Sequence, residues 1–421
     1  MKIAIIGSGI AGLSCAYHLN KDHRLVVYEK NNYLGGHTDT HSLNIAGQTI
    51  NIDSGFIVFT RAQYPCFSAM LDALGIASKP TNMSFSVVNE NSGTHYNATD
   101  LNRLFCQRSN LIKPRFYRMI ADIIRFYKSA PAVLKSTDEL TTVKAYLQQH
   151  RYSTVFMRDH LFPMIGALWS AAPATVEQFP IRYLVEYMHS HGMMNLWKRP
   201  QWRTLTNGSN EYVARLKTSL GNTEFRVNCG VSNVIRETDR VLIHANSCEP
   251  EYFDAVIFAN HSDQARMLLQ KPSKDENEIL SAIPFQKNDI IIHTDPTIMP
   301  DNRRAWASWN ARVTAAQQAH CCATYWMNSL QGLTLDQDVF VSLNENQPIE
   351  QSKVLHKRTY HHPVYTASSV AARRKLTLIN GKNRSFYVGA YWGWGFHEDG
   401  ARSAVEAVSL LKNTLSESVS V

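Results

Sequence analysis

The chain lacks the features of a membrane-spanning or disulfide-stabilised protein. None of its apolar runs approaches the roughly 20 residues that a transmembrane helix needs. Its seven cysteines are odd in number and form no CxxC pair, and no histidine cluster completes a metal-binding spacing. Scattered thiols suit a reducing compartment, so we expect free cysteines and a cytoplasmic protein.

Acidic residues are also fewer than basic ones, 35 against 43, which gives a net charge of +8. This mild excess is not a nucleic-acid signature, so we expect no nucleic-acid partner. The excess of positive charge is compatible with an anionic substrate, with binding to a lipid surface, or with no specific function. Two close histidine pairs, His189/His191 and His361/His362, lack a third ligand, and we predict no metal site. The 421 residues, 44% of them hydrophobic, exclude disorder and leave room for two or three globular domains.

The first thirty residues carry the sharpest pattern. An apolar run at Lys2–Ile6 leads into Gly7-Ser8-Gly9-Ile10-Ala11-Gly12, and a helical spacing follows. A second apolar run, Arg24–Tyr28, ends at Glu29. Strand, glycines, helix, strand and acid in this order are the fingerprint of a dinucleotide site, in which Glu29 accepts hydrogen bonds from the ribose hydroxyls.

Each glycine has its own expected task. Gly7 permits the tight turn, Gly9 lets the backbone approach a pyrophosphate, and Gly12 lets the helix pack close to the strand. The free N–H groups at the start of the helix, at Ile10 and Ala11, favour the phosphates.

A second glycine pair follows Glu29 and indicates which dinucleotide is bound. The segment after Glu29 resembles the E-x(5)-G-G-R-x-x-T pattern of the flavin-containing amine oxidase and phytoene desaturase superfamily. In that superfamily these residues meet the diphosphate of FAD. His37 stands where the superfamily usually has Arg, and a histidine need not carry charge at pH 7. The resemblance implies FAD contacts from Lys30, Gly35, Gly36, His37 and Thr38.

The resemblance extends along most of the chain. The segment at 51–56 looks like the D-x-G segment that passes the flavin ring, and 225–234 has the strand rhythm that leads into a central sheet. The segment at 386–400, followed by a helical run, is similar to the C-terminal FAD motif, although Ala390 stands where an acid is usual. Further FAD contacts are therefore expected from Gly55, Val231, Gly389 and Gly400.

The resemblance also implies the architecture. We expect an α/β fold with a Rossmann-like FAD-binding domain of the glutathione-reductase type and an inserted α+β substrate domain. The FAD-binding domain is expected to be discontinuous, at 1–75, 205–265 and 370–421, and the substrate domain to comprise 76–204 and 266–369. No cysteine lies in a motif for covalent flavin attachment, so the FAD is expected to be non-covalent.

Two segments, GAYWGWGFHEDG at 389–400 and HSHGMMNLWKRPQWRTLTNGS at 189–209, indicate a narrower group. They resemble bacterial FAD-dependent proteins often encoded beside cyclopropane-fatty-acid-synthase-like methyltransferases. The group's context implies lipid metabolism and a methyltransferase partner. Of the rings at 391, 392, 394 and 396, we expect one or two to wall the flavin pocket.

Catalytic candidates follow only from the motifs expected near the flavin ring. These candidates are Asp53, His397 and Glu398. His397 is proposed as a proton shuttle because the ordinary pKa of histidine is about 6.5.

The stretch from Arg103 to Lys135 contains eight basic residues and one acid, Asp122. Phe116, Ile120, Ile123 and Tyr127 fall on one helical face. A basic amphipathic helix can lie on an anionic membrane, which would place the protein peripherally at its inner face. In the alternative interpretation, the apolar face is core and the cations are solvated.

Several functions remain open at this point. The first is an FAD-dependent oxidoreductase that takes a hydride from a C–H bond of an unsaturated or methyl-modified acyl chain. The second is an oxidase of a small amine, and the third is a flavin-binding partner of a lipid methyltransferase without turnover of its own. An NAD-dependent dehydrogenase is disfavoured, because the second glycine pair would have no task.

Overall fold

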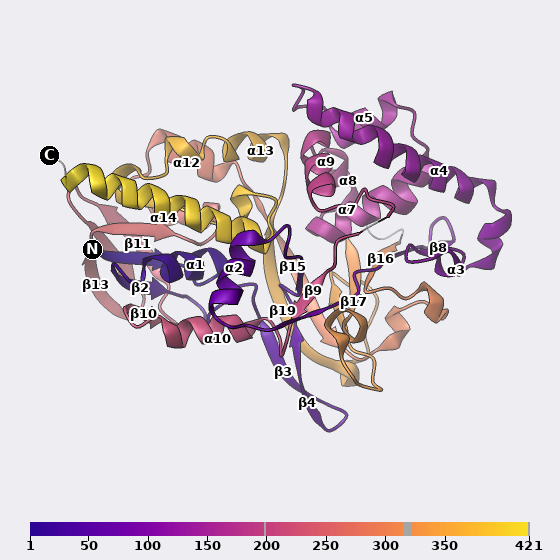
Figure 1. The fold of residues 1–421 in the computed structure, drawn as a ribbon, viewed down its shortest axis with the longest axis horizontal. Coiled ribbons are helices and arrows are strands. Elements are labelled where there is room, and N and C mark those ends of the chain that lie inside the picture. Colours follow the sequence, from indigo (N-terminus) through magenta and orange to yellow (C-terminus); the bar gives the residue numbers. More distant parts are fainter. Residues whose placement is uncertain (198, 315–320, 420–421) are drawn as a thin grey trace.

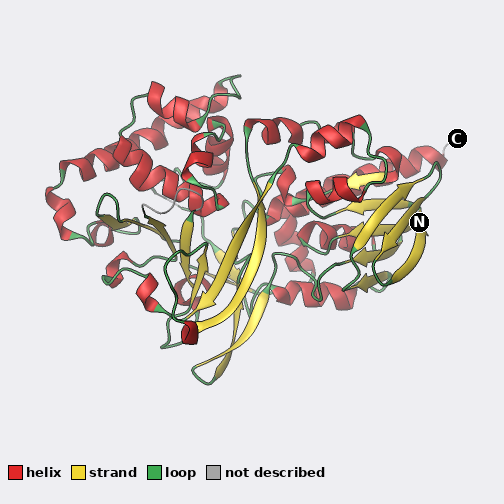
Figure 2. Ribbon diagram, turned by 180° about the vertical axis from the view of Figure 1, so that it is seen from behind, coloured by secondary structure: helices red, strands yellow, loops and turns green. Residues whose placement is uncertain are grey.

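The computed structural model describes residues 1–197, 199–314 and 321–419. Figure 1 shows two parts side by side, with both chain ends on the α/β part. In Figure 2, seen from behind, helices gather over one end of the other part and long strands run through the middle of the molecule.

A five-stranded parallel sheet is the centre of the α/β part. Its order is β10-β2-β1-β14-β20. The strands come from the three segments predicted for FAD binding: β1 (Lys2–Ile6), β2 (Arg24–Tyr28), β10 (Thr223–Arg226), β14 (Ala255–Phe258) and β20 (Ser385–Tyr387).

Alternation along β1 explains how this sheet is buried on both faces. Ile3 and Ile5 pack into the core formed with the helices, whereas Ala4 and Ile6 pack into the core on the opposite face. Successive side chains of a strand point to opposite faces, so a strand covered on both sides reads as a continuous apolar run. The helices on the first face are α1 (Ile10–Leu19), α2 (Pro65–Ala73), α10 (Asn210–Ser219) and α14 (His397–Val419).

The second face is covered by a three-stranded antiparallel meander and by short helices. These elements are β11 (Val231–Arg236), β12 (Val241–Ala245), β13 (Cys248–Phe253), α11 (Ser262–Leu268), α12 (Lys274–Ser281) and α13 (Ala367–Arg373). Ile279 and Leu280 of α12 belong to this core. Helix α12 therefore lies with the FAD-binding sheet, although the sequence analysis assigned 266–369 to the substrate domain.

The expectation that all cysteines are free is wrong for one pair. Cys229 and Cys248 are bonded to each other across the meander. Both β11 and β13 pair with β12, at Val231↔Ala245 and Ala245↔Cys248, which brings the start of β11 near the start of β13. Cys15, Cys66, Cys106 and Cys321 are free, as expected.

The second part is built on a seven-stranded sheet. Its strands, in spatial order, are β19 (Val354–Pro363), β15 (Phe285–His293), β18 (Phe340–Leu343), β17 (Cys322–Trp326), β16 (Trp309–Val313), β7 (Phe85–Asn89) and β8 (Thr94–Asn97). All of them come from 76–204 and 266–369, the segments predicted for the substrate domain.

Helices cap one end of this sheet (Figure 1). They are α3 (Leu101–Leu104), α4 (Pro114–Ser129), α5 (Val143–Gln149), α6 (Thr154–Phe156), α7 (Phe162–Trp169), α8 (Pro173–Glu177) and α9 (Ile181–Ser190). The apolar face predicted for α4 is turned into the protein: Phe116 is buried, and Ile120 and Ile123 pack against core clusters. This face is core and not a surface for a membrane.

Two small sheets join the parts. One is the ribbon of β3 (Thr40–Ile45) and β4 (Gln48–Asp53), and the other has the order β5-β9-β6, with β5 (Val58–Phe59), β6 (Ser78–Pro80) and β9 (Arg203–Leu205). Within the described residues, none of the helices is both long enough and apolar enough to span a membrane.

Candidate functional site

A cavity of about 930 Å³ extends from the glycine loop after β1 into the second part. Its walls include the 7–11 loop, the 35–37 loop, residues 358–363 of β19, and helices α7 and α9. The cavity therefore begins at the carboxyl end of a parallel strand, where ligands of open α/β sheets bind.

The glycine loop leaves space for a phosphate group. A Cβ atom at Gly9 would meet nothing within 4 Å, although Gly9 lines the cavity. At Gly12, by contrast, a Cβ would lie 2.0 Å from the Gly7 carbonyl oxygen, because α1 packs this closely on the turn. The first N–H groups of α1 have no partner within the helix and supply a positive end for an anion.

Glu29 is buried and holds this end of the cavity together. Its Oε2 accepts hydrogen bonds from the backbone N–H and the hydroxyl of Ser8, at 3.2 and 2.6 Å. Its Oε1 accepts from the backbone N–H and side chain of Asn31, both at 2.9 Å. The carboxylate thus lies between the two loops on which a dinucleotide would rest, and its contact with a ribose stays a prediction.

The two glycine pairs of the sequence lie against each other. The Gly35 N–H donates to the Ser8 carbonyl at 3.0 Å, and a Cβ at Gly36 would lie 3.2 Å from the Gly9 Cα. At Gly55, a Cβ would lie 2.2 Å from the His37 carbonyl oxygen, so the segment with Gly55 must also approach closely.

His37 faces the cavity as a neutral ring. Its ring lies 4.7 Å from that of Tyr360 and 5.3 Å from that of His362, measured between centroids. Burial and the nearby His361 lower the pKa of His37 to about 4. Its buried Nε2 finds no hydrogen-bond partner among the described residues. Such a buried polar atom at a cavity wall fits a group that binds there.

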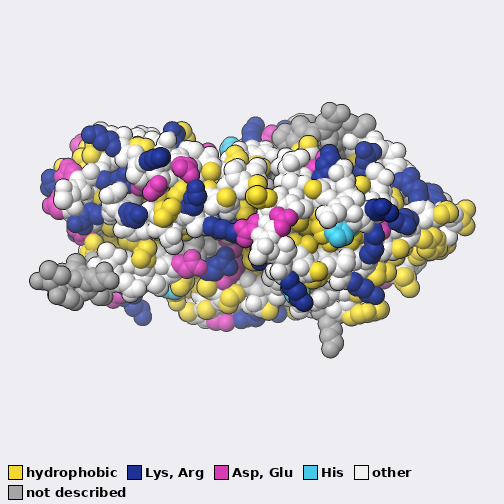
Figure 3. All heavy atoms as spheres, turned by 90° about the horizontal axis from the view of Figure 1, so that it is seen from above, with side chains coloured by type: hydrophobic (Ala, Val, Ile, Leu, Met, Phe, Trp, Pro, Cys, Tyr) yellow, Lys and Arg dark blue, Asp and Glu magenta, His cyan; other side chains and the backbone are white. Residues whose placement is uncertain are grey.

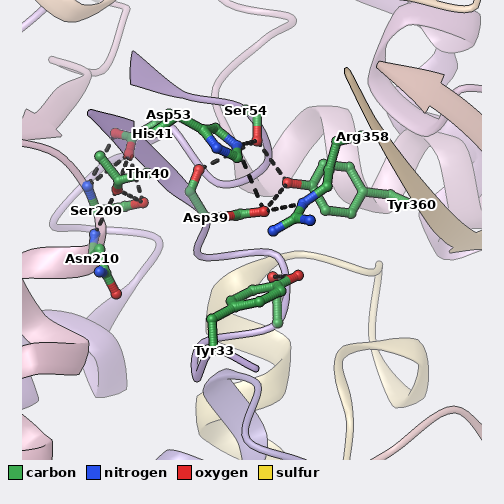
Figure 4. Close-up of polar contacts among 11 residues, drawn as sticks. Tyr33, Asp39, Thr40, His41, Asp53, Ser54, Ser209, Asn210, Arg358 and Tyr360 are labelled. Carbon is green, nitrogen blue, oxygen red and sulfur yellow. Dashed lines mark hydrogen bonds and ion pairs between the residues drawn. The ribbon is translucent and has the colours of Figure 1, made fainter. Parts of the chain in front are cut away.

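A cation that the sequence analysis did not assign lies on the same wall. Arg358 of β19 donates from Nε to Asp39 at 2.6 Å, and its guanidinium lies 4.6 Å from the Tyr33 ring centroid. The Tyr360 hydroxyl donates to the same Asp39 oxygen at 3.1 Å (Figure 4). The structure therefore supplies an arginine from a distant strand to the cavity that His37 also lines, and His37 is the position that usually carries Arg in the resembling superfamily.

Most residues predicted to contact the cofactor line this cavity. They are Gly7, Gly9, Ile10, Ala11, Glu29, Lys30, Gly35, Gly36, His37, Gly55, Val231 and Gly389.

Three residues predicted to contact the cofactor do not line the cavity: Gly12, Thr38 and Gly400. A Cβ at Gly400 would lie 2.7 Å from Ile10, so this glycine permits the packing of α14 on α1. The Thr38 hydroxyl bonds the Tyr212 hydroxyl at 2.6 Å. The close packing at Gly12 is the task expected of it, and cofactor contacts from Gly12, Thr38 and Gly400 stay predictions.

Two of the three catalytic candidates do not reach the cavity. Asp53 is fully buried and accepts hydrogen bonds from the Ser209 N–H at 2.8 Å and Gln331 at 3.0 Å (Figure 4 shows the Ser209 side). Burial raises its pKa to about 6, although the hydrogen bonds of Thr40 and Ser209 oppose this. Glu398 accepts from the backbone N–H groups of Cys66 and Phe67, at 2.9 and 3.0 Å, and so caps the start of α2. The structure therefore shows structural contacts for both acids, and their catalytic role stays a prediction.

His397 does line the cavity. Its Nε2 bonds the Tyr212 hydroxyl at 2.9 Å and the Thr38 hydroxyl at 3.2 Å. Burial lowers the pKa of His397 well below its ordinary value, so the ring is neutral at pH 7. The structure thus differs from the expectation of an unperturbed pKa near 6.5.

Aromatic rings form much of the wall beyond the glycine loop. Tyr391 and Phe396 line the cavity, in agreement with the prediction for the C-terminal cluster. Phe396 stacks on Tyr187 with centroids 4.8 Å apart, and Trp169 contacts Tyr187 at the same distance. Tyr187 and Trp169 were not predicted, because their helices meet the C-terminal motif only in the tertiary structure.

The far end of the cavity is largely apolar, and Arg199 is the one cation among its described residues. Arg199 lines it and is exposed. Burial raises the pKa of the neighbouring Tyr127 to about 12 and lowers that of His160 to about 3; the charge of Arg199 opposes the first shift and adds to the second. Other residues at this end are Met83, Phe85, Ala98, Met164, Ala167, Leu168, Met193, Trp309 and Leu343. Among the described lining residues, the only carboxylate of the whole cavity is Glu29, at the opposite end.

The described residues contain no group of three or more His, Cys, Asp or Glu arranged to hold a metal ion. No cysteine is present among the described residues that line the cavity. The free loop at Gly9, the start of α1, and the unpaired Nε2 of His37 together fit a non-covalently bound FAD.

Comparisons with known proteins agree with this site. A family model described as flavin-containing amine oxidoreductase matches residues 10–342. A search of curated proteins finds no match. Among solved structures, a cyclohexylamine oxidase from Brevibacterium oxydans IH-35A is similar, with a TM-score of 0.71, 14% identity and 99% of each chain covered. A CLA-producing fatty acid isomerase from P. acnes is similar with a TM-score of 0.69 and 15% identity over 97% of each chain. At these identities the structural likeness establishes the fold.

Proposed function

The chain belongs to the flavin-containing amine oxidoreductase family and is a flavin-dependent oxidoreductase; from this premise we propose that its substrate is an acyl chain with an anionic head, such as an unsaturated or methyl-modified fatty acid. The observation that carries the proposal is the far end of the cavity. It is largely apolar, and among its described residues Arg199 is the one cation and none is a carboxylate.

Charge decides between an acid and an amine. A protonated amine at this end would face Arg199 and find no opposite charge, which makes its burial costly. A fatty acid would place its carboxylate at the exposed guanidinium and its chain along the apolar wall. Arginine suits this task because its planar fork binds both carboxylate oxygens.

The residues of the chain position such a substrate in three ways. Arg199 binds the carboxylate of the fatty acid at the far end of the cavity, where the apolar side chains exclude water. The rings of Phe396 and Tyr187 direct the acyl chain toward the glycine loop. FAD, when bound, supplies the two-electron oxidation of a C–H bond. The aromatic wall also suits a small amine, so amine oxidation is the second candidate.

The test is an anaerobic titration of the FAD-loaded protein, followed by flavin absorbance. Oleate and methyl-branched fatty acids are compared with cyclohexylamine and putrescine. Bleaching by a fatty acid supports the proposal, provided that Arg199→Gln raises KM about tenfold or more with little change in kcat, as expected for a lost charge-assisted contact. Lys217→Gln, on the exposed side of α10, is the matched control. Bleaching by an amine alone overturns the acyl substrate in favour of amine oxidation.

The methyltransferase partner stays a separate proposal. If neither substrate class bleaches the bound flavin, the acyl proposal fails. Copurification with a lipid methyltransferase would then favour a partner protein without turnover of its own.

A further inference from the structure

Large apolar side chains are exposed together at the end of the molecule farthest from the chain ends. Helix α3, the turn Arg108–Ile112 and the first turn of α4 form this end, which we call the α3–α4 tip (Figure 1). Ile112 is 85% exposed and Leu101 76%, with Leu111 and Tyr117 about half exposed. Seen from above in Figure 3, hydrophobic side chains gather at this end beside Lys and Arg side chains. Clustered exposure of this kind marks an interaction site.

The charge around these side chains is basic. Residues 100–118 contain Arg103, Arg108, Lys113, Arg115 and Arg118, and one acid, Asp100. Arg103, Arg115 and Arg118 pair with Asp100, Asp159 and Asp122.

Two cations flank the apolar pair directly. Arg108 donates to the neutral Phe105 carbonyl and Asn102 side chain, at 3.2 and 2.6 Å. In the described chain, neither Arg108 nor Lys113 forms an ion pair with an acid. Leu111 and Ile112 lie between them in the sequence, so the apolar side chains are bordered by charge that no described acid neutralises.

We propose that the α3–α4 tip docks on the surface of an anionic phospholipid bilayer. Leu111 and Ile112 insert at the level of the acyl boundary, and Arg108 and Lys113 bind the headgroup phosphates. The combination matches the two signals that stable peripheral binding needs, apolar burial and attraction to anionic lipid. A protein interface is less suited, since lysine is depleted at the core of such interfaces. This surface differs from the face of α4 that the sequence predicted, which is core.

The docked tip would lie close to the far end of the cavity. Ala98, which lines the cavity, is three residues before Leu101. Helix α4 carries Tyr117 at the tip and Tyr127 at the cavity wall, a rise of about 15 Å along the helix. Docking itself does not depend on the identity of the substrate.

The experiment is sedimentation of the FAD-loaded protein with vesicles, without turnover. Vesicles of phosphatidylcholine mixed with phosphatidylglycerol are compared with phosphatidylcholine alone. We expect binding to the mixed vesicles, weaker binding in high salt, and little binding to phosphatidylcholine. Arg108→Gln/Lys113→Gln should lower the partition coefficient about 30-fold, or about fivefold per cation. Leu111→Ser/Ile112→Ser should lower it at least about tenfold.

Matched controls exclude general effects of charge and hydrophobicity. Arg215→Gln/Lys217→Gln removes the same charge from α10, and Leu378→Ser removes an exposed apolar side chain from the α/β part. Both should bind as the unmodified protein does, and all variants should keep its melting temperature and FAD content. Absence of vesicle binding, equal binding to both vesicle types, or tip variants that bind like the controls would each overturn the proposal. None of these results bears on flavin reduction by a substrate.

Discussion

The ring of His397 stacks on the ring of Phe56, with centroids 3.7 Å apart and planes 8° from parallel. Through Nε2 the same ring bonds Tyr212 on α10 and Thr38 in the loop after the second glycine pair. One side chain at the start of α14 therefore connects three other segments at the cavity wall.

His397→Ala tests whether this residue positions the wall or moves a proton. Because burial lowers its pKa well below the ordinary value, we expect no ionisation of His397 in the pH profile of flavin reduction. We expect weaker FAD binding, by about tenfold, from the loss of two hydrogen bonds and a stacked ring. Binding is measured by fluorescence titration of the apoprotein. A pKa near neutrality that disappears in the variant, with FAD affinity unchanged, would instead support the proton shuttle.

Gly9→Ala tests the phosphate end of the cavity. The new methyl group meets no protein atom within 4 Å, so the melting temperature of the apoprotein should not change. The methyl group would occupy the space expected for the pyrophosphate, and overpacking by one carbon costs about 1–3 kcal/mol, or at least about a fivefold rise in Kd for FAD. Gly221→Ala, another glycine with open space at its Cβ, is the control. Unchanged FAD affinity would place the phosphates elsewhere.

Arg358→Ala tests the cation that lines the same cavity as His37. We expect a Kd for FAD raised about tenfold, since charge-assisted hydrogen bonds contribute about 1.5–3 kcal/mol, and a weaker dependence of FAD binding on salt. Lys357→Ala removes an exposed cation from the adjacent position of β19 and should leave both quantities unchanged. If the two variants behave alike, Arg358 acts only on Asp39 and Tyr33.

Asp53→Ala tests whether this buried acid has a structural or a catalytic role. The Ser209 N–H and the Gln331 amide would lose their acceptor in a buried place, at about 1–3 kcal/mol each, so the melting temperature should fall by several degrees. Since Asp53 does not line the cavity, the rate of flavin reduction per bound FAD should stay within about twofold of the original. Loss of reduction with an unchanged melting temperature would return Asp53 to a catalytic role. Differential scanning fluorimetry and stopped-flow absorbance give the two readings.

The lowered pKa of His160 predicts how the free energy of unfolding changes at acidic pH. Burial lowers its pKa from 6.5 to about 3, and Arg199 adds to this. The unfolded chain therefore binds the proton more readily than the folded protein, and stability is lost as the pH falls below about 6.5. Between pH 7 and 5 this one group should cost about 2 kcal/mol. Thermal unfolding of His160→Asn should show a smaller acid loss, whereas His150→Asn, at an exposed site, should follow the original protein. Equal acid loss in both variants would assign the effect to other groups.

The sequence by itself determined the cofactor end of the protein. Gly7, Gly9 and Glu29 act within a single strand–turn–helix–strand unit, where the backbone conformation and the spacing of a few neighbouring residues are sufficient. The continuous apolar run within Lys2–Ile6 likewise predicts a strand that is covered on both faces.

Only the tertiary structure decided what the other residues do. Asp53 meets Gln331 across 278 positions of the chain, and Glu398 meets Cys66 across 332, so both acids serve contacts that no local spacing reveals. Arg199 lies within a segment that the sequence singled out, yet its place as the one cation among the described residues at the far end depends on all the elements around it. Burial, charge environment and the ends of a cavity are properties of many segments brought together, and packing of distant segments is what fixes them.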